Sequence, residues 1–363
     1  MLHKKNSLLS AISLILGLTL SGQAFASNGF FAIGQGTKSK GMGGVGQALS
    51  QDSMAAAINP AGMVFQGDRF DIGIEYLKTS TTIDDPSVPG FDTKLYPLSL
   101  GYNGMLSPQS SVGVSLYAND GIDGDSRLIQ SFANFSYSHI IGEKSSLGGS
   151  IIVAGQFFDT IGNGGSGVTD ITYGAGFSFG WQGYVGAGIT LGATYQSQIK
   201  MSENTDYSLV LPDNGEIDIP STYGAGIAWK HQGLTLAADY QVIKYGNVTA
   251  LSYPLGFGWS DIKIYKLGAQ YELKEWAFRA GWNHSENPIP GNTLDTYGVM
   301  PNFITDHMTA GLSKKFGQSS ELNVALIYGF KASQSWASST SPGTTYNADA
   351  TQYAAEISYG VRF

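Results

Sequence analysis

Short segments in which apolar and polar residues alternate dominate this chain. In residues 69–77, Phe70, Ile72, Ile74 and Tyr76 fall on one side of the alternation, with charged residues and a glycine between them. The same period of two recurs along the chain up to its last residue. Successive side chains of a β-strand point to opposite faces of the sheet, so the pattern predicts strands with one apolar and one polar face.

Fourteen strands are predicted in this way. They span residues 69–77, 93–102, 111–118, 131–140, 145–155, 169–180, 184–198, 221–230, 233–243, 261–272, 275–284, 306–316, 319–331 and 350–363. After residue 26, no apolar run reaches the length of about 18 residues that a membrane-spanning helix requires. A soluble β-sandwich and a membrane barrel would both show alternation of this kind.

The connectors between the strands favour the barrel. Those after even-numbered strands are short, such as residues 141–144, 182–183 and 231–232, with 103–110 the longest of them. Those after odd-numbered strands are mostly long: 78–92, 119–130, 156–168, 199–220, 244–260, 285–305 and 332–349. Short turns at one rim and long loops at the other are typical of outer-membrane barrels. We therefore predict an all-β fold, a 14-stranded antiparallel transmembrane β-barrel over residues 69–363.

Composition agrees with a membrane protein and excludes several other classes. Charged residues make up 13% of the 363 residues, against about 25% in soluble domains, and aromatic residues make up 12%. A net charge of -8 leaves no basic surface for phosphate contacts, so we expect no nucleic-acid partner. The sequence has no Cys, which excludes disulfides, thiolate metal sites and a cysteine nucleophile.

The first 26 residues have the pattern of a secretory signal peptide. Lys4 and Lys5 precede an apolar run over residues 8–20, and Ala24 and Ala26 supply the small residues that a signal peptidase recognises. We expect Sec-dependent export, cleavage after Ala26, and a final location in the bacterial cell outer membrane.

Residues 27–68 do not alternate and are rich in glycine and alanine. A glycine-rich phosphate loop at residues 41–46 would need a preceding strand and a following βαβ unit, and the sequence predicts neither. Small residues let a compact segment pack inside a narrow lumen. We therefore predict that residues 27–68 form an N-terminal plug, or hatch, inside the barrel.

The plug carries a family resemblance. Its residues include, in chain order, Gly29 and Phe30, then Gly-Met-Gly at residues 41–43, and then Asn59, Pro60, Ala61, Gly62 and Met63, just before the first predicted strand. This order resembles the FadL family of outer-membrane transporters for long-chain fatty acids and other hydrophobic compounds (OMPP1/FadL/TodX type). The chain also ends on a strand with Phe363, which resembles the terminal signal that the barrel-assembly machinery recognises.

The resemblance implies uptake without a covalent step. A hydrophobic molecule would be captured by apolar outer loops, passed to a site in the lumen, and released sideways once the plug shifts. In the family, release is thought to occur at a kink in the third strand, which here would involve Gly113, Asn119 and Gly121. One departure is that Gly44 stands where family members often carry a basic residue, with Lys38 and Lys40 upstream instead.

Large apolar residues in the predicted loops are candidates for hydrophobic ligand capture. They are Phe157, Phe158, Leu209, Leu211, Phe257, Trp259 and Phe303. Such residues in segments that face water usually mark binding, and the alternative is that they pack on each other as a cap. Candidate partners for a cargo carboxylate are Arg69, Lys38, Lys40, Lys266 and Arg279. Each of these cations would otherwise pair with a lumen acid, since polar lining is normal inside barrels.

Other functions remain as alternatives. The barrel could be an uptake channel for aromatic or aliphatic hydrocarbons, or a loop-based receptor or adhesin without transport. We expect no enzyme: His284 and His307 lie near the outer rim without a serine motif, and neither a catalytic residue, a cofactor nor a metal site is predicted. The expected surroundings are outer-membrane lipid and lipopolysaccharide, and a closed barrel needs no second copy, so we expect a monomer.

Overall fold

The computed structural model describes residues 28–84, 90–121, 126–160, 170–204, 212–252, 256, 258–289, 303–337 and 343–363. The predicted signal peptide lies outside the described residues. Within them, the strands are β1 (Arg69–Ile83), β2 (Phe91–Leu95), β3 (Leu98–Ser107), β4 (Ser110–Gly121), β5 (Ser126–Ile141), β6 (Ser145–Thr160), β7 (Asp170–Gly186), β8 (Ile189–Gln196), β9 (Lys200–Met201), β10 (Thr222–His231), β11 (Leu234–Ile243), β12 (Ile262–Leu273), β13 (Trp276–Ser285), β14 (Asp306–Phe316), β15 (Ser320–Ala337) and β16 (Thr345–Arg362). The helices are short: α2 (Thr37–Lys40), η1 (Ser53–Ala57), η2 (Pro60–Phe65), η3 (Asp213–Gly215) and η4 (Tyr245–Asn247).

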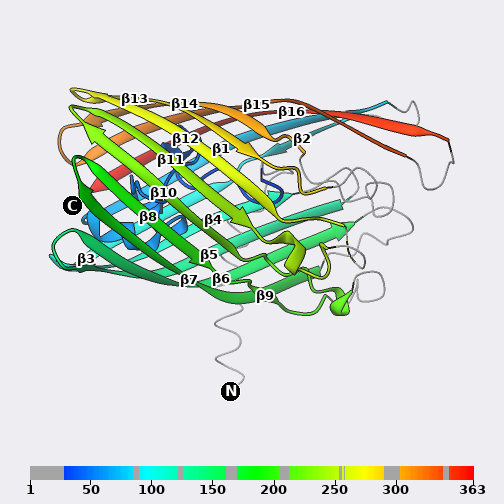
Figure 1. Cartoon of the computed structure of the whole chain (residues 1–363), viewed down its shortest axis with the longest axis horizontal. Coiled ribbons are helices and arrows are strands. Elements are labelled where there is room, and N and C mark those ends of the chain that lie inside the picture. Colours follow the sequence, from blue (N-terminus) through cyan, green and yellow to red (C-terminus); the bar gives the residue numbers. More distant parts are fainter. Residues whose placement is uncertain are drawn as a thin grey trace, which may run out of the picture.

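One sheet closes on itself to form a barrel (Figure 1). The described strands number 16, and β16 pairs with β1 from Arg362 opposite Arg69 to Ala348 opposite Ile83. The short strands β2 and β9 each pair with one neighbour, so the other 14 strands form the wall, all paired antiparallel. The predicted 14-stranded barrel is therefore confirmed. A hairpin of β15 and β16 continues beyond the rim on the loop side (Figure 1).

Two predicted connectors on the turn side are wrong, and several strands extend further on the loop side than predicted, such as β5 and β15. The turn predicted at residues 182–183 lies within β7, and the chain reverses at residues 186–188, where φ is 108°, 50° and 81° in succession. Two of these three residues are glycines, which adopt positive φ without strain. The connector predicted at residues 103–110, the longest on the turn side, is mostly strand, because β3 continues to Ser107 and β4 begins at Ser110.

The wall is apolar on its outer face and polar on its inner face. On β1, Ile72 and Ile74 are 47% and 44% exposed. The lumen-facing side chains that flank them, Asp71 and Glu75, are 4% and 7% exposed. This is the reverse of a soluble protein and suits an exterior surrounded by hydrocarbon. In the described part of the chain, no helix has the length and apolar character needed to cross a membrane.

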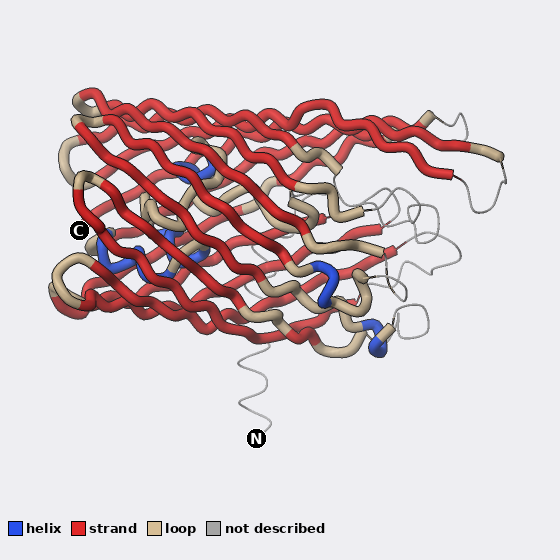
Figure 2. Tube along the Cα trace, in the orientation of Figure 1, coloured by secondary structure: helices blue, strands red, loops and turns tan. Residues whose placement is uncertain are grey.

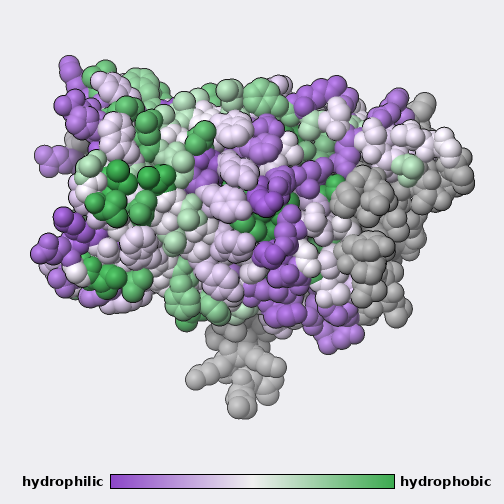
Figure 3. Space-filling model, viewed as in Figure 1, coloured by the Kyte–Doolittle hydropathy of each residue, from purple (hydrophilic) through white to green (hydrophobic). Residues whose placement is uncertain are grey.

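Aromatic side chains border the apolar wall at both rims. Near the short turns, Tyr102 stacks on Phe363 with ring centroids 6.2 Å apart. Near the long loops, the Tyr240 and Tyr265 rings lie 5.4 Å apart. Figure 3 shows hydrophobic side chains spread over the wall between a hydrophilic turn rim and a hydrophilic surface nearer the loops. Amphipathic rings in these positions suit the headgroup levels of a bilayer.

Residues 28–68 run inside the barrel (Figure 2). Local sequence explains their short helices. Asp52 caps η1 by accepting a hydrogen bond from the Met54 N–H at 3.0 Å. Asn59 caps η2 in the same way through the Ala61 N–H, and Pro60 supplies a fixed φ at the first position.

Glycines let the backbone of this inner segment touch the wall. A Cβ atom placed on Gly281 of β13 would lie 2.1 Å from the Gly43 nitrogen. One placed on Gly192 of β8 would lie 1.8 Å from the Gln47 carbonyl oxygen. The inner segment and the wall therefore fit only because side chains are missing on the lumen face.

We expect Gly281→Ala to destabilise the folded barrel by about 1–3 kcal/mol, the usual cost of overpacking, because the new methyl group meets backbone that cannot rotate away. Gly149→Ala is the matched control. Its Cβ would meet the Phe179 ring at 3.3 Å and the Ser178 carbonyl oxygen at 3.5 Å, which is ordinary contact. Thermal unfolding in detergent measures both, and equal melting temperatures for the two variants would contradict the close fit.

Candidate functional site

Apolar side chains from the long loops pack into one cluster at the loop end of the lumen. We call this the outer cluster, and its large buried members are Phe30, Phe158, Tyr245, Trp259, Phe303 and Trp336. Three of the predicted capture residues, Phe158, Trp259 and Phe303, belong to it. The predicted loop position of Phe157 and Phe158 is wrong, because β6 continues to Thr160 and carries both residues. Phe157 is half-buried, and Leu209, Leu211 and Phe257 lie outside the described residues. The capture role of these side chains stays a prediction.

Phe30, from the start of the inner segment, fills the middle of the outer cluster. Its ring lies 4.4 Å from that of Trp259 and 6.2 Å from that of Tyr245. The Tyr245 hydroxyl accepts a hydrogen bond from the Phe30 N–H at 2.8 Å and donates one to the Asn28 carbonyl oxygen at 2.7 Å. Burial raises the pKa of Tyr245, which keeps the hydroxyl protonated as a donor. The Tyr245 hydroxyl thus binds the backbone on both sides of Gly29.

The Gly29 position has room for no larger residue. Its φ is 70°, and a Cβ atom would lie 2.4 Å from the Tyr245 hydroxyl oxygen. The indole N–H of Trp259 is buried without a partner among the described residues. When Phe30 leaves, therefore, the outer cluster would present an apolar space with hydrogen-bond donors from Trp259 and Tyr245.

The Asn-Pro-Ala-Gly-Met segment, residues 59–63, fastens the inner segment to the wall on the turn side. The Asn59 side chain donates to the carbonyl oxygens of Gln47 at 2.6 Å and Trp181 at 3.1 Å. The Ala61 carbonyl oxygen accepts from the hydroxyls of Ser138 at 2.9 Å and Ser146 at 2.7 Å. Gly62 lies against Ser50, and the Met63 side chain is buried near Gly113 of β4. These contacts give the predicted plug motif a structural role.

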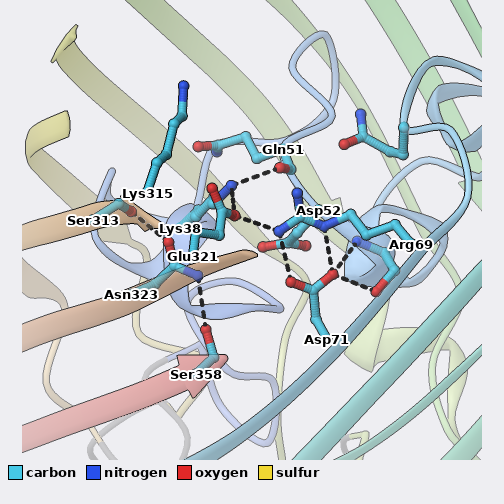
Figure 4. A network of polar contacts seen from close by, with 12 residues as sticks. Lys38, Gln51, Asp52, Arg69, Asp71, Ser313, Lys315, Glu321, Asn323 and Ser358 are labelled. Carbon is cyan, nitrogen blue, oxygen red and sulfur yellow. Dashed lines mark hydrogen bonds and ion pairs between the residues drawn. The ribbon is translucent and has the colours of Figure 1, made fainter. Parts of the chain in front are cut away.

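A buried charge network joins α2 to the seam where the barrel closes, and Figure 4 shows the part of it around Lys38, Arg69 and Glu321. Lys40 forms ion pairs with Glu75 at 2.5 Å and with Glu356 at 2.6 Å. Lys38 and Arg69 both pair with Glu321, and Arg69 also pairs with Asp71 at 2.7 Å. These ion pairs connect α2 with β1, β15 and β16.

In this network, the predicted carboxylate partners Lys38, Lys40 and Arg69 are all paired with acidic side chains of the protein itself. Burial and the neighbouring Arg69 lower the pKa of Lys38 to about 8 despite its ion pair with Glu321. The fourth candidate, Arg279, donates to the Ser313 hydroxyl at 2.6 Å, and its Nε has no partner among the described residues.

Lys266 differs from the other four candidates. It lies on β12, points into the lumen and is 5% exposed. None of the described residues forms an ion pair or hydrogen bond with it. Its side chain lines an internal cavity of about 60 Å³ together with Phe31, Gln47 and Tyr117. A cavity of about 150 Å³ is needed to hold benzene, so the present space accommodates water but no hydrophobic cargo.

The wall strand opposite Lys266 holds the inner segment in place. Asp239 on β11 is paired in register with Lys266. Its Oδ2 accepts hydrogen bonds from the backbone N–H groups of Gly46 at 2.7 Å and Gln47 at 3.0 Å. The order of residues along the chain does not reveal this contact, because Asp239 lies 193 residues from Gly46.

The wall contains a break in its hydrogen bonding. Strands β2 and β3 would be one strand but for Tyr96 and Pro97 between them. Proline has no N–H to donate to a ladder, and the Pro97 carbonyl oxygen accepts from the Glu75 N–H at 3.0 Å. Beyond this point, β2 pairs with β1 and, in the described residues, not with β4. The break could have been found as a proline inside an alternating segment.

The unpaired edge of β4 begins at Tyr117. The predicted gate residues Asn119 and Gly121 lie on it, whereas Gly113 pairs regularly with Asn103 and Ser136. β4 keeps an unbroken register with β5 over its whole length, so the interruption lies in the second wall strand.

The inner segment covers this edge. The Asn119 side-chain oxygen accepts hydrogen bonds from the Gln35 side chain at 3.1 Å and, more weakly, from the Ala32 N–H at 3.5 Å. Residues 28–35 thus run from the outer cluster, past the Lys266 cavity, to the unpaired edge. We call them the plug arm.

Comparison with known proteins identifies relatives in structure alone. No family model and no curated protein matches the sequence. The toluene transporter TodX of P. putida matches with a TM-score of 0.73 and 17% identity, covering 91% of this chain and 99% of that chain. The toluene transporter TbuX of Ralstonia pickettii matches with a TM-score of 0.65 and 19% identity, covering 91% of this chain and 99% of that chain.

A Pseudomonas aeruginosa FadL homologue matches with a TM-score of 0.69 and 16% identity, covering 92% of this chain and 100% of that chain. The chain therefore has the fold of these barrels over almost their whole length.

We expect Tyr245→Phe to loosen the plug arm, because the variant loses two buried hydrogen bonds while keeping the ring. At about 0.5–1.5 kcal/mol each, their loss should speed hydrogen exchange of the Phe30 amide by about fivefold or more. Tyr240→Phe, on the outer face of the preceding strand β11, is the control and should leave the exchange rate of the Phe30 amide unchanged. An unaltered Phe30 exchange rate in Tyr245→Phe would mean that the ring packing alone holds the arm.

Lys40→Met should destabilise the protein by about 3–5 kcal/mol, because it leaves Glu75 and Glu356 buried without their cation. Lys331→Met removes an exposed ion pair with Asp349 (2.8 Å) and should cost less than about 1 kcal/mol. Denaturant unfolding in detergent compares the two. Similar small losses would show that the buried network is dispensable.

Proposed function

We propose that this chain is a member of the FadL family and takes up hydrophobic small molecules, above all long-chain fatty acids, across the bacterial outer membrane. The observation that carries the proposal is the position of the plug arm. It links an apolar cluster at the loop end of the lumen, a cavity lined by a lysine without an ion pair, and a break in the wall's hydrogen bonding. A passive pore or an adhesin would not need these three features along a single segment.

The route begins at the outer cluster. A hydrophobic cargo would take the place of Phe30 beside Trp259 and Tyr245, with the burial of apolar surface as the driving force. Displacement of Phe30 would pull on residues 31–35 and open the lumen cavity, which is too small for the cargo while the arm is docked. The arm thus acts as a gate that the cargo itself opens.

The route ends at the unpaired edge of β4. Movement of Gln35 away from Asn119 would uncover the stretch where β2 and β4 are not joined. A cargo leaving there enters lipid directly, and transfer into lipid contributes about 0.8 kcal/mol for each buried CH₂ group. Lateral release therefore spares an insoluble molecule any passage through water.

Lys266 supports an acid as the cargo. It is the predicted cation to which no described residue forms an ion pair or a hydrogen bond, and it is buried against the cavity, so a cargo carboxylate would give its ammonium group a direct partner. The alternative cargo is an aromatic hydrocarbon, which the names of TodX and TbuX as toluene transporters support. Lys266 would then have no role in binding.

We also propose the expected biogenesis and state. Residues 1–26 would direct Sec-dependent export, the assembly machinery would recognise the end of the chain at Phe363, and the barrel would act as a monomer among outer-membrane lipid and lipopolysaccharide. The closure of β16 on β1 supports a monomer, because no strand is left to pair with a second copy at the seam.

Uptake of radiolabelled oleate and toluene tests the proposal in cells that lack their own fatty acid transporter. We expect this protein to speed oleate entry, and Lys266→Met to reduce that entry about tenfold or more, since a hydrogen-bonded charge contributes about 1.5–3 kcal/mol. Lys263→Met, an exposed lysine of the same strand, is the control. Toluene entry alone would favour the hydrocarbon channel, and entry of neither compound would refute transport of both.

A further inference from the structure

The strength of the hydrogen bonds by which Asp239 holds the inner segment depends on the charge of its carboxylate. Its side chain is 6% exposed and accepts two backbone hydrogen bonds through Oδ2, while Oδ1 has no partner among the described residues. Hydrogen bonds to an ionised carboxylate are about twice as strong as those to a neutral acceptor. Anything that disfavours the ionised form of Asp239 will therefore weaken its hydrogen bonds to the backbone N–H groups of Gly46 and Gln47.

The nearest cation in register is Lys266. The two residues lie directly opposite each other on β11 and β12, and both side chains point into the lumen. Directly opposed side chains have Cβ atoms about 4.5–5.5 Å apart. Even so, no ion pair joins them within 4 Å, and Lys266 lines the cavity instead. Lys266 thus lies beside Asp239 and lines the space into which a cargo would enter, whereas Asp239 does not line it.

We propose that Asp239 couples the binding of an anionic cargo at Lys266 to the release of the inner segment at Gly46 and Gln47. This inference rests on the proposed function, because it requires a cargo that carries a carboxylate. On binding, the cargo carboxylate and Asp239 share one buried cation. A second anion close by in a medium of low dielectric constant disfavours the ionised form of Asp239, and its hydrogen bonds to the segment weaken.

The geometry reinforces the electrostatic effect. Gln47 both donates its N–H to Asp239 and lines the cavity, where its side-chain oxygen accepts from the Thr194 hydroxyl at 2.6 Å. A fatty acid whose carboxyl group and adjoining chain enter a cavity of about 60 Å³ must displace lining groups. Several of these groups belong to the inner segment, and Gln47 is the one whose N–H donates to Asp239, so charge and space act at the same place.

The coupling is reciprocal. If cargo binding weakens the hold of Asp239 on the segment, then loss of that hold strengthens cargo binding by the same factor. Couplings of this kind amount to about 5–150-fold in affinity. This distinguishes Asp239, a positioning residue that acts through Lys266, from an acid that merely lines the lumen.

Hydrogen exchange of single amides in the detergent-solubilised full chain tests the inference without a variant. We expect oleate to speed exchange of the Gly46 and Gln47 amides about fivefold or more. Methyl oleate, which has the same chain without the charge, should not do so. The Gly43 amide is an internal reference, since it donates to the neutral Thr309 hydroxyl at 2.8 Å and should keep its rate.

Asp239→Asn, which keeps the shape and an acceptor oxygen, adds the reciprocal measurement. The variant should bind oleate about fivefold or more tightly, and oleate should no longer change exchange at Gly46 and Gln47. Asp349→Asn is the control: it removes an acid from the exposed hairpin and should leave oleate affinity unchanged.

The contrary results separate the two proposals. Oleate that fails to bind the wild-type chain would overturn both the fatty acid function and the coupling. Oleate that binds through Lys266 but leaves exchange at Gly46 and Gln47 unchanged would overturn the coupling alone. An equal effect of methyl oleate, or an unchanged oleate affinity in Asp239→Asn, would also overturn it, because neither result is compatible with competition between two anions for one cation.

Discussion

Inside a bilayer, each backbone N–H and C=O group must find its partner within the protein, and most features of this molecule follow from that requirement. It closes 14 wall strands into one sheet, and closure then divides the side chains into a lipid-facing apolar set and a lumen-facing polar set. The lumen consequently contains buried ions and amides that need partners of their own. The inner segment supplies many of them, so the contents of the barrel complete the wall's hydrogen bonding as well as block its passage.

The inner segment is held in two physically different ways. Its later part is tied by buried ion pairs and by the capping residue Asn59, interactions that are costly to break singly. The plug arm is held by the packing of Phe30, the hydroxyl of Tyr245 and the amide of Asn119. An arm fastened by apolar contacts responds to an apolar ligand, whereas the charged anchor is indifferent to it. The break beside Pro97 lies where the weakly held part covers the wall.

Sequence reasoning recovered the architecture because a two-residue period is a local signal. Alternation gave the strand number, and the loop lengths gave the orientation of the turns and loops. It misplaced the turn at residues 186–188, since two glycine-containing turns were available and only backbone conformation distinguishes them. It also could not rank five candidate cations. Whether Lys40 or Lys266 lacks a partner depends on how the inner segment sits against a wall formed hundreds of residues later.

The charge network at the seam also bears on how the barrel closes. Lys40 belongs to the inner segment, Glu75 to the first strand and Glu356 to the last, and all three are buried together. Closure of the barrel without the inner segment would place Glu75 directly opposite Glu356 with no cation to compensate the two buried carboxylates. The inner segment therefore stabilises the seam that closes the cylinder.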